Sequence, residues 1–371
     1  MPANALTAAN AGSGKLNLLG LPSERLAQFF EGLGEKPYRA RQIMRWVYQR
    51  HVLDFEDMTD LSIALRERLG GIAELAVPPL LSDERSTDGT RKWLLDVGAG
   101  QAVESVFIPE PNRGTLCISS QAGCALDCSF CATGRQGFNR NLTSAEILGQ
   151  VVYARRQLEP AEVTNVVFMG MGEPLANYRN VVPVVKLLLD DRAFGLSRRR
   201  VTISTAGLVP QIRKLADECN TALAVSLHAP TDDLRDELVP INRIHPIEEL
   251  LDACWQYAER IASRQITFEY VLLDRVNDDV AQARQLVKLL RGRPAKVNLI
   301  PFNPFRNSGF ACSAPEAIDR FWQTLRAAGI VATIRRPRGD DIAAACGQLA
   351  GRVSDRRRVR LGEKLSGADN L

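Results

Sequence analysis

The sequence predicts an α/β fold, namely a partial (βα)6-type TIM barrel preceded by a small N-terminal helical domain and a β-hairpin linker. Segments rich in Val, Ile and Thr alternate with helical segments over residues 111–345, and this alternation implies a parallel sheet with right-handed crossovers. Apolar residues recur with a helical period in residues 16–78, whereas residues 79–110 carry strand and turn signals. A chain of 371 residues is long enough for two or three domains.

The N-terminal residues 1–15 are small and polar, and we expect them to be disordered. In the helical domain we expect one helix capped by Ser23 and a second that starts near Pro37, since proline is tolerated in a first helical turn. Apolar side chains of the second helix should face a core: Ile43, Trp46 and Val47. Basic residues interleave with aromatic ones on this helix. The pattern suits RNA contact, although a plain amphipathic helix explains it nearly as well.

The linker is predicted to be a hairpin. Its first strand, Arg91–Val97, follows an Asp88-Gly89 turn, and its second, Val103–Ile108, follows a glycine turn at residues 98–100. From its position alone, Glu104 is interpreted as a strand residue that faces solvent.

The barrel is predicted to contain strands at residues 114–119, 164–169, 201–205, 221–227, 266–273, 296–301 and 330–335. Helices are expected between them at residues 144–158, 178–190, 208–217, 247–263, 279–291 and 315–328. Thr143 and Glu146 have the spacing of a capping box at the start of the first of these helices. In such barrels the chemistry lies on loops that follow the carboxyl ends of the strands.

A cysteine-rich loop follows the first barrel strand. Its cysteines have the spacing Cys-x3-Cys-x2-Cys: Cys124, Cys128 and Cys131. Structural zinc sites and ferredoxin-type clusters use four ligands, so three thiolates indicate a cluster with one iron left open. The alternative is a helix that buries the three cysteines as small apolar residues. Gly123, Asp127 and Gly134 argue against that helix, because glycine and aspartate are poor helix formers.

Short loops with small and polar residues follow four later strands: 170–174, 204–207, 226–229 and 301–304. Two glycines in the first loop allow a ligand to approach the backbone, and Glu173 beside them could bind an ammonium group. One such loop is usually a turn or a cap. Because four such loops are expected around a cysteine-rich loop, a shared pocket is a better interpretation than four independent turns or caps.

Of the remaining cysteines, Cys346 is the most informative. It lies among small residues after the last strand, where an accessible thiol could act as a nucleophile. Cys117 lies on the first strand, and position alone favours a buried core thiol. Cys219 and Cys254 fall in apolar helical segments, and Cys312 has no assigned role. Because the chain has only three histidines, a histidine-based metal site or a catalytic triad is poorly supported.

Charge is concentrated at the C-terminus. The chain has a net charge of +4, and residues 331–371 hold nine Lys/Arg against five Asp/Glu, so they account for the whole excess. A basic cluster of this kind suits a phosphate backbone, although a solvated tail is an equal alternative. We find no signal peptide and no apolar run of the ~20 residues that a membrane span needs. The sequence therefore favours a cytoplasmic protein without membrane contact, and we expect a monomer.

Several of these motifs together resemble a known family. Cys124-x3-Cys128-x-Phe130-Cys131 is similar to the signature loop of radical S-adenosylmethionine enzymes. Within that superfamily, the segments 170–175, 226–229, 301–303 and 345–348 resemble the dual-specificity ribosomal RNA and transfer RNA adenine C2 methyltransferases. The resemblance extends over nearly the whole chain, including the helical domain at residues 16–78, which it implies to be an RNA-binding accessory domain.

The resemblance implies a 4Fe-4S cluster on Cys124, Cys128 and Cys131, with S-adenosylmethionine chelating the open iron. It implies a cofactor site formed by Gly172, Glu173, Ser204, Ser226, Leu227, His228 and Asn303. It also implies two S-adenosylmethionine molecules per turnover, 23S ribosomal RNA and transfer RNA as substrates, and an electron donor such as flavodoxin or ferredoxin.

The resemblance further implies a route through a methyl-cysteine. Cys346, on a loop in residues 346–371 together with a basic tail, would take a methyl group from one S-adenosylmethionine. A 5′-deoxyadenosyl radical from the second would abstract hydrogen from that methyl group, and the carbon radical would add to adenine C2. Glu104 would remove the C2 proton. Cys117 would then attack the sulfur of Cys346, forming a transient disulfide and releasing methyladenine.

Three alternatives remain. The same machinery could methylate adenine C8, because the motifs are shared. Another radical S-adenosylmethionine enzyme could act on protein or a small molecule, although the basic C-terminus and helical domain argue against it. A non-catalytic RNA-binding protein with a structural metal is the third.

Overall fold

The structure is a computed structural model that describes residues 14–158, 163–261 and 264–353. The disorder expected for residues 1–15 falls almost entirely outside this range. So does the basic tail from residue 354 onwards.

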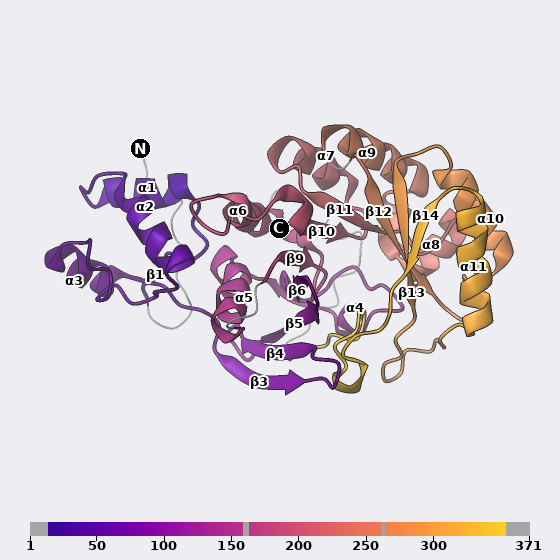
Figure 1. The fold of residues 1–371 in the computed structure, drawn as a ribbon, viewed down its shortest axis with the longest axis horizontal. Helices are drawn as coiled ribbons and strands as arrows, with labels where there is room; N and C mark the ends of the chain where they lie inside the picture. The colour runs from indigo at the N-terminus through magenta and orange to yellow at the C-terminus, as the bar shows by residue number, and fades with distance from the viewer. Residues whose placement is uncertain (1–13, 159–162, 262–263, 354–371) are drawn as a thin grey trace.

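The N-terminal part forms a separate small helical layer (Figure 1). Its elements are β1 (Leu16–Asn17), α1 (Ser23–Gly32), α2 (Arg39–Met44) with a π-helical turn at Arg45–Gln49, α3 (Ile63–Ile72) and β2 (Ala73–Glu74). Ile43, Trp46 and Val47 are buried in its core, as predicted. The cap of α1 differs from the prediction. Pro22 holds the cap position and Ser23 is the first helical residue, with no side-chain cap hydrogen bond.

The barrel strands form one open parallel sheet within a ten-stranded sheet of order β14-β13-β12-β11-β10-β9-β6-β5-β4-β3. The parallel strands are β6 (Arg113–Cys117), β9 (Asn165–Phe168), β10 (Val201–Thr205), β11 (Ala222–Ser226), β12 (Ile266–Leu272), β13 (Ala295–Pro301) and β14 (Val331–Ile334). Each lies close to its predicted segment. The sheet does not close, because β14 and β3 are its free edges. The fold is therefore a partial barrel.

The predicted hairpin extends this sheet. Its strands are β4 (Arg91–Asp96) and β5 (Ala102–Glu110), and β3 (Leu80–Arg85) pairs with β4 on the outer side. Because β5 pairs antiparallel with β6, the linker strands continue the barrel sheet and are not a separate arm. This pairing brings β5, which carries Glu104, beside β6, which carries Cys117.

Helices cover the outer face of the sheet (Figure 1). They are α5 (Ser144–Gln157), α6 (Tyr178–Leu189), α7 (Val209–Glu218), α9 (Ile247–Arg260), α10 (Val280–Leu290) and α11 (Pro315–Ala327), with the short α8 (Asp232–Leu238) before α9. The capping box of α5 is confirmed: the Glu146 N–H donates to Thr143 Oγ1 at 3.2 Å, and the Thr143 N–H donates to Glu146 Oε2 at 2.8 Å. Among the helices of the described residues, none is long and apolar enough to cross a bilayer.

The cysteine loop is closed by a short hairpin that the sequence did not predict. Strands β7 (Gln121–Gly123) and β8 (Phe138–Asn141) pair antiparallel, and α4 (Ala132–Gln136) lies between them. Gly123 has a φ of +80°, and a Cβ there would overlap the Gly137 carbonyl. Only glycine fits this position. The Cys124 N–H donates to the same carbonyl oxygen at 2.9 Å, so the start of the loop is fixed by its own hairpin.

Candidate active site

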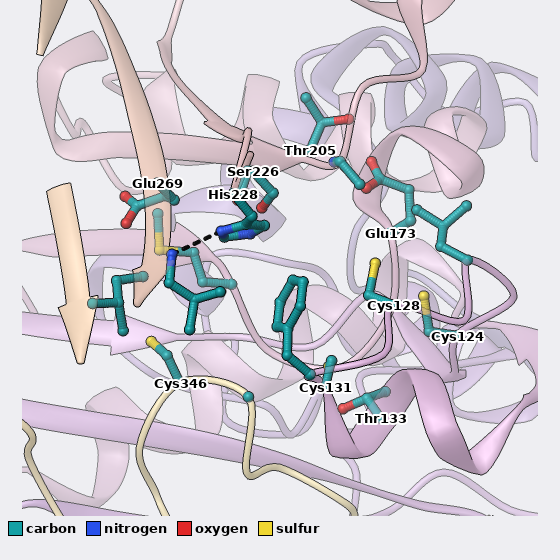
Figure 2. Close-up of a pocket in the computed structure, with 18 of the residues that line it drawn as sticks. Cys124, Cys128, Cys131, Thr133, Glu173, Thr205, Ser226, His228, Glu269 and Cys346 are labelled. Carbon is teal, nitrogen blue, oxygen red and sulfur yellow. Dashed lines mark hydrogen bonds between the residues drawn. The ribbon is translucent and has the colours of Figure 1, made fainter. Parts of the chain in front are cut away.

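A cavity lies at the carboxyl ends of the barrel strands, between the cysteine loop and the segment that carries Cys346 (Figure 2). Most residues that the sequence indicated line it: Cys124, Cys128, Cys131, Gly172, Glu173, Ser204, Ser226, His228 and Cys346. They come from five segments that are far apart in the chain. The parallel sheet brings them together, because all its strands end at one edge.

The three clustered thiols line the cavity. Burial raises the pKa of Cys124 to about 12, and it also raises the pKa values of Cys128 and Cys131. Such thiols remain protonated unless a metal binds them, since metal coordination deprotonates a thiol outright.

The donor set of these thiols matches an iron–sulfur cluster, which cysteine thiolates hold. In this conformation, no group of three Cys, His, Asp or Glu side chains within the described ranges is positioned to hold a single metal ion.

Glu173 forms the opposite wall from Cys346 (Figure 2). Its carboxylate accepts backbone hydrogen bonds from Leu175 at 2.9 Å and from Ala206 at 2.8 Å. Burial nevertheless raises the pKa of Glu173 to about 7. Gly172 beside it has a φ of +93°, and a Cβ there would overlap the Gln121 side chain. The loop therefore presents a buried carboxylate whose charge a cationic ligand would stabilise.

His228 is held as a neutral donor. Its Nδ1 accepts the backbone N–H of Val271 at 2.9 Å, the dashed line in Figure 2. Burial lowers the pKa of His228 to about 3, so the single ring proton lies on Nε2. The ring packs edge-on against Phe130 of the cysteine loop, with centroids 4.5 Å apart. The site thus offers a fixed N–H donor next to the thiols.

Cys346 lies on a segment that is bonded to both neighbouring loops. The Ala132 N–H, directly after Cys131, donates to Gly347 O at 2.8 Å. Asn303 Nδ2 donates to the Cys346 carbonyl at 3.1 Å. Asn303 lies outside the main cavity, in a smaller adjoining one that Cys346 also lines. In this structure Asn303 therefore orients the Cys346 segment.

Cys117 is buried and does not line the main cavity. Burial raises the pKa of Cys117 to about 12, and the charge of Cys346 adds to this. The negative charge of Cys346, followed by those of Glu269 and Cys117, holds the pKa of Arg335 above its ordinary value.

Glu269 and Arg335 also line the cavity, and neither was predicted to be a site residue. Glu269 interrupts an apolar strand, and this is the signal that could have indicated it. Glu269 Oε2 accepts from Asn298 Nδ2 at 2.7 Å. Arg335 directly follows the last strand, β14. Polar residues just after the other parallel strands were predicted to line the site, and the same argument applies to Arg335.

Besides Asn303 and Cys117, two further expected site residues lie away from the lining of the main cavity. Leu227 is fully buried, and its carbonyl accepts a hydrogen bond from Arg235 Nε at 3.1 Å. Glu104 is buried rather than solvent-facing, and its Oε2 accepts the backbone N–H groups of Ala350 and Gly351. Both residues therefore contact the segments that shape the cavity, and in this conformation neither contributes to its wall.

Two family models match the chain. Residues 16–75 match the N-terminal domain of the ribosomal RNA large subunit methyltransferases, and residues 118–287 match the radical SAM superfamily. The match to the N-terminal domain coincides with the helical layer, and the second match begins directly after β6 and spans the cysteine loop and the strands β7–β12.

Two solved structures are also similar to this chain. A radical SAM methyltransferase from Sphaerobacter thermophilus is 46% identical, with a TM-score of 0.85, over 90% of this chain and 98% of that one. A domain of the pyruvate-formate lyase-activating enzyme from Bacteroides vulgatus is 19% identical over 46% of this chain and 99% of that one, with a TM-score of 0.36. At 46% identity over nearly the full length, the first match is decisive: the chain belongs to the radical SAM methyltransferases with the N-terminal domain of the ribosomal RNA large subunit methyltransferases.

Proposed function

We propose that this enzyme methylates C2 of a specific adenine in 23S ribosomal RNA and in transfer RNA, through a methyl group carried on Cys346. One observation supports this most strongly: a lone thiol, Cys346, lines the same cavity as the three clustered cysteines. A second lone thiol, Cys117, is electrostatically coupled to it. A radical enzyme without a carrier cysteine has no need for this pair.

Family membership implies a 4Fe-4S cluster and S-adenosylmethionine as cofactors. Cys124, Cys128 and Cys131 would hold the cluster, which leaves one iron for the cofactor. Glu173 would bind the cofactor's ammonium group. Gly172, Ser204, Ser226 and His228 would line its site, while Leu227 and Asn303 would support that site from behind. We propose two S-adenosylmethionine molecules per turnover, because one supplies the methyl group and the other is consumed by radical chemistry.

When bound, the cluster and cofactor supply the one-electron chemistry that an electron-poor aromatic carbon requires. The chain's own residues would do the rest. The Cys346 sulfur accepts the methyl group and carries it to adenine C2, forming a covalent link between protein and RNA. Glu104 takes the C2 proton. The Cys117 thiolate attacks the Cys346 sulfur, and the bond from that sulfur to the bridging carbon breaks. The carbon takes up a proton and leaves as the methyl group of methyladenine, and a Cys117–Cys346 disulfide remains. External thiols then reduce the disulfide.

The proposed partners follow from the family and the charge. The name of the N-terminal family model points to ribosomal RNA, and the excess of basic residues at the C-terminus suits a phosphate backbone. Flavodoxin or ferredoxin is the proposed electron donor. We further propose that the enzyme is a cytoplasmic monomer.

Nucleoside mass spectrometry of 23S ribosomal RNA and transfer RNA from a strain lacking the gene tests the proposal. We expect 2-methyladenosine to be lost from both RNAs and restored by the wild-type gene but not by Cys346→Ala. Loss of 8-methyladenosine instead would favour methylation at C8. Unchanged RNA would overturn the proposal.

A further inference from the structure

Arg235, on α8, is a fully buried arginine with a relative exposure of 0%. Its guanidinium donates to three backbone carbonyls: Ala206 at 2.6 Å, Ser226 at 3.0 Å and Leu227 at 3.1 Å. Ala206 follows the end of β10, whereas Ser226 and Leu227 lie at the end of β11. One side chain therefore ties together two neighbouring strand ends that form the wall of the cavity.

Among the residues that the structure describes, no carboxylate forms an ion pair with this guanidinium. Its fourth hydrogen-bond partner is the neutral Asn242 Oδ1 at 2.8 Å. Asn242 in turn donates to Asp232 Oδ1 at 2.9 Å and to Asp236 Oδ1 at 2.7 Å. The Asn242 side-chain amide therefore lies between the guanidinium and the two carboxylates. Burial lowers the pKa of Arg235 to about 10. Burying a charge without a direct counter-ion is costly, so a neighbouring negative group is expected.

The cysteine loop is that neighbour. The carbonyl of Leu238, at the end of α8, accepts the N–H of Ser129 at 3.1 Å, so Cys128 is held close to the helix. Cys128 directly precedes Ser129, so this hydrogen bond joins the helix that carries Arg235 to the loop of the proposed cluster ligands. A cluster with three thiolates carries net negative charge, and charges near a cluster help to set its reduction potential.

We propose that Arg235 is a positioning residue that holds the ends of β10 and β11 in the geometry that binds S-adenosylmethionine, and that its buried charge raises the reduction potential of a cluster on Cys128. The proposal rests on the cofactor site proposed above. The Arg235 side chain has two separate roles in this proposal. Its planar set of N–H donors positions the strand ends, and its positive charge raises the reduction potential.

Two substitutions separate these properties. Arg235→Lys keeps the charge, but a single ammonium cannot reproduce the planar fork. Arg235→Met removes both. The matched control is Tyr257→Phe, because the Tyr257 hydroxyl also donates to two backbone carbonyls, Cys219 and Thr221, each at 3.0 Å. These carbonyls lie at the opposite end of β11, away from the cavity.

The readouts are the S-adenosylmethionine dissociation constant, by equilibrium binding, and the cluster reduction potential, by a titration followed by electron paramagnetic resonance. Both use the full chain with its cluster. We expect Arg235→Lys to weaken binding about tenfold or more, as is typical when residues that orient ligands are changed, with the potential kept near wild type. Arg235→Met should weaken binding and also shift the reduction equilibrium about tenfold towards the oxidised form, which is 59 mV for one electron. Tyr257→Phe should change neither.

Wild-type affinity in both Arg235 variants would overturn the positioning role, and an unshifted potential in Arg235→Met would overturn the charge role. If Arg235→Met does not fold, Asn242→Ala removes the acceptor that orients the guanidinium and keeps its charge. It should weaken binding and leave the potential unchanged, and unchanged binding would count against the proposal. If the wild-type protein itself binds no S-adenosylmethionine, the proposed function fails instead.

Discussion

The Glu104 carboxylate accepts a hydrogen bond from the backbone N–H of Ala350 at 2.8 Å, and a second from Gly351 at 3.2 Å. These contacts fix the segment that carries Cys346 to the middle of β5. Lys92, 3.4 Å from the other carboxylate oxygen, also donates to the carbonyl of Ile342 at 2.5 Å. Glu104 therefore holds the Cys346 segment in this conformation.

Glu104→Ala should loosen the Cys346 segment. Hydrogen bonds to a charged group contribute about 1.5–3 kcal/mol, so we expect the amides of Ala350 and Gly351 to exchange with deuterium about tenfold faster or more. Glu84→Ala is the control, because Glu84 also lies 3.5 Å from Lys92 but contacts neither amide. Hydrogen exchange read by mass spectrometry makes the comparison, and equal protection in Glu104→Ala and wild type would show that Glu104 does not hold the segment.

Gly172→Ala should damage the cofactor loop. The substitution combines a left-handed backbone, with φ at +93°, and an overlap between the new Cβ and Gln121. We expect a loss of about 1–3 kcal/mol in unfolding free energy, measured by denaturant titration, together with weaker cofactor binding.

Gly292→Ala is the matched control for that substitution. Gly292 also has a positive φ, at +75°, but nothing lies within 4 Å of an added Cβ. The Gly292→Ala variant should lose about 1 kcal/mol of unfolding free energy, from backbone strain alone. It should bind the cofactor normally. If Gly172→Ala loses no more unfolding free energy than Gly292→Ala, the overlap with Gln121 does not destabilise the variant.

Glu173 should make cofactor binding depend on pH. Burial raises its pKa from 4.5 to about 7, so the cofactor-free fold binds the proton more tightly than the unfolded chain does. That contribution to stability is fully present below pH 4.5 and is lost as the pH rises through about 7. A cofactor ammonium group needs the carboxylate, and binding therefore releases the proton. We expect the affinity to rise up to about tenfold per pH unit towards pH 7 and then level off.

Isothermal titration calorimetry from pH 5.5 to about 8 measures this dependence. Glu173→Gln cannot titrate, so its weaker binding should be flat over the same range. A flat profile in the wild type, or the same slope in Glu173→Gln, would assign the proton to another group.

Much of the fold could be predicted because its signals are local. Each predicted barrel strand and helix lies close to an observed one, since β-branched runs and amphipathic periods extend over enough residues to be distinctive. The helix α8 escaped prediction because five of its seven residues are charged, leaving no apolar stripe. Strands β7 and β8 contain only three and four residues, too few for an alternating pattern.

Site residues could be predicted where their place in the chain determines their place in the fold. Polar residues just after a strand, such as Glu173 and His228, must lie at one edge of a parallel sheet. Arg235 gave no such signal, because its hydrogen bonds are to carbonyls at the ends of two strands that precede it in the chain. The burial of Glu104 could not be predicted either, since it depends on the segment around Ala350, about 250 residues later in the chain.

Cys346→Ala should abolish methylation of RNA, because the proposed carrier is removed, while the cavity and the cluster ligands remain. Transfer of a radiolabelled methyl group from S-adenosylmethionine to RNA measures this. Cys254→Ala is the control, since Cys254 is buried in α9 outside the cavity lining. Methylation by Cys346→Ala at the level of the control would end the carrier hypothesis.

The covalent intermediate offers the most direct test of the account. In Cys117→Ala, the thiol that resolves the link is missing, so the RNA should remain attached to Cys346. We predict a slower-migrating, nuclease-sensitive species, with peptide mass spectrometry placing a methylene-bridged adenosine on Cys346 through adenine C2. Release of methylated RNA by Cys117→Ala, with no adduct on Cys346, would contradict the account.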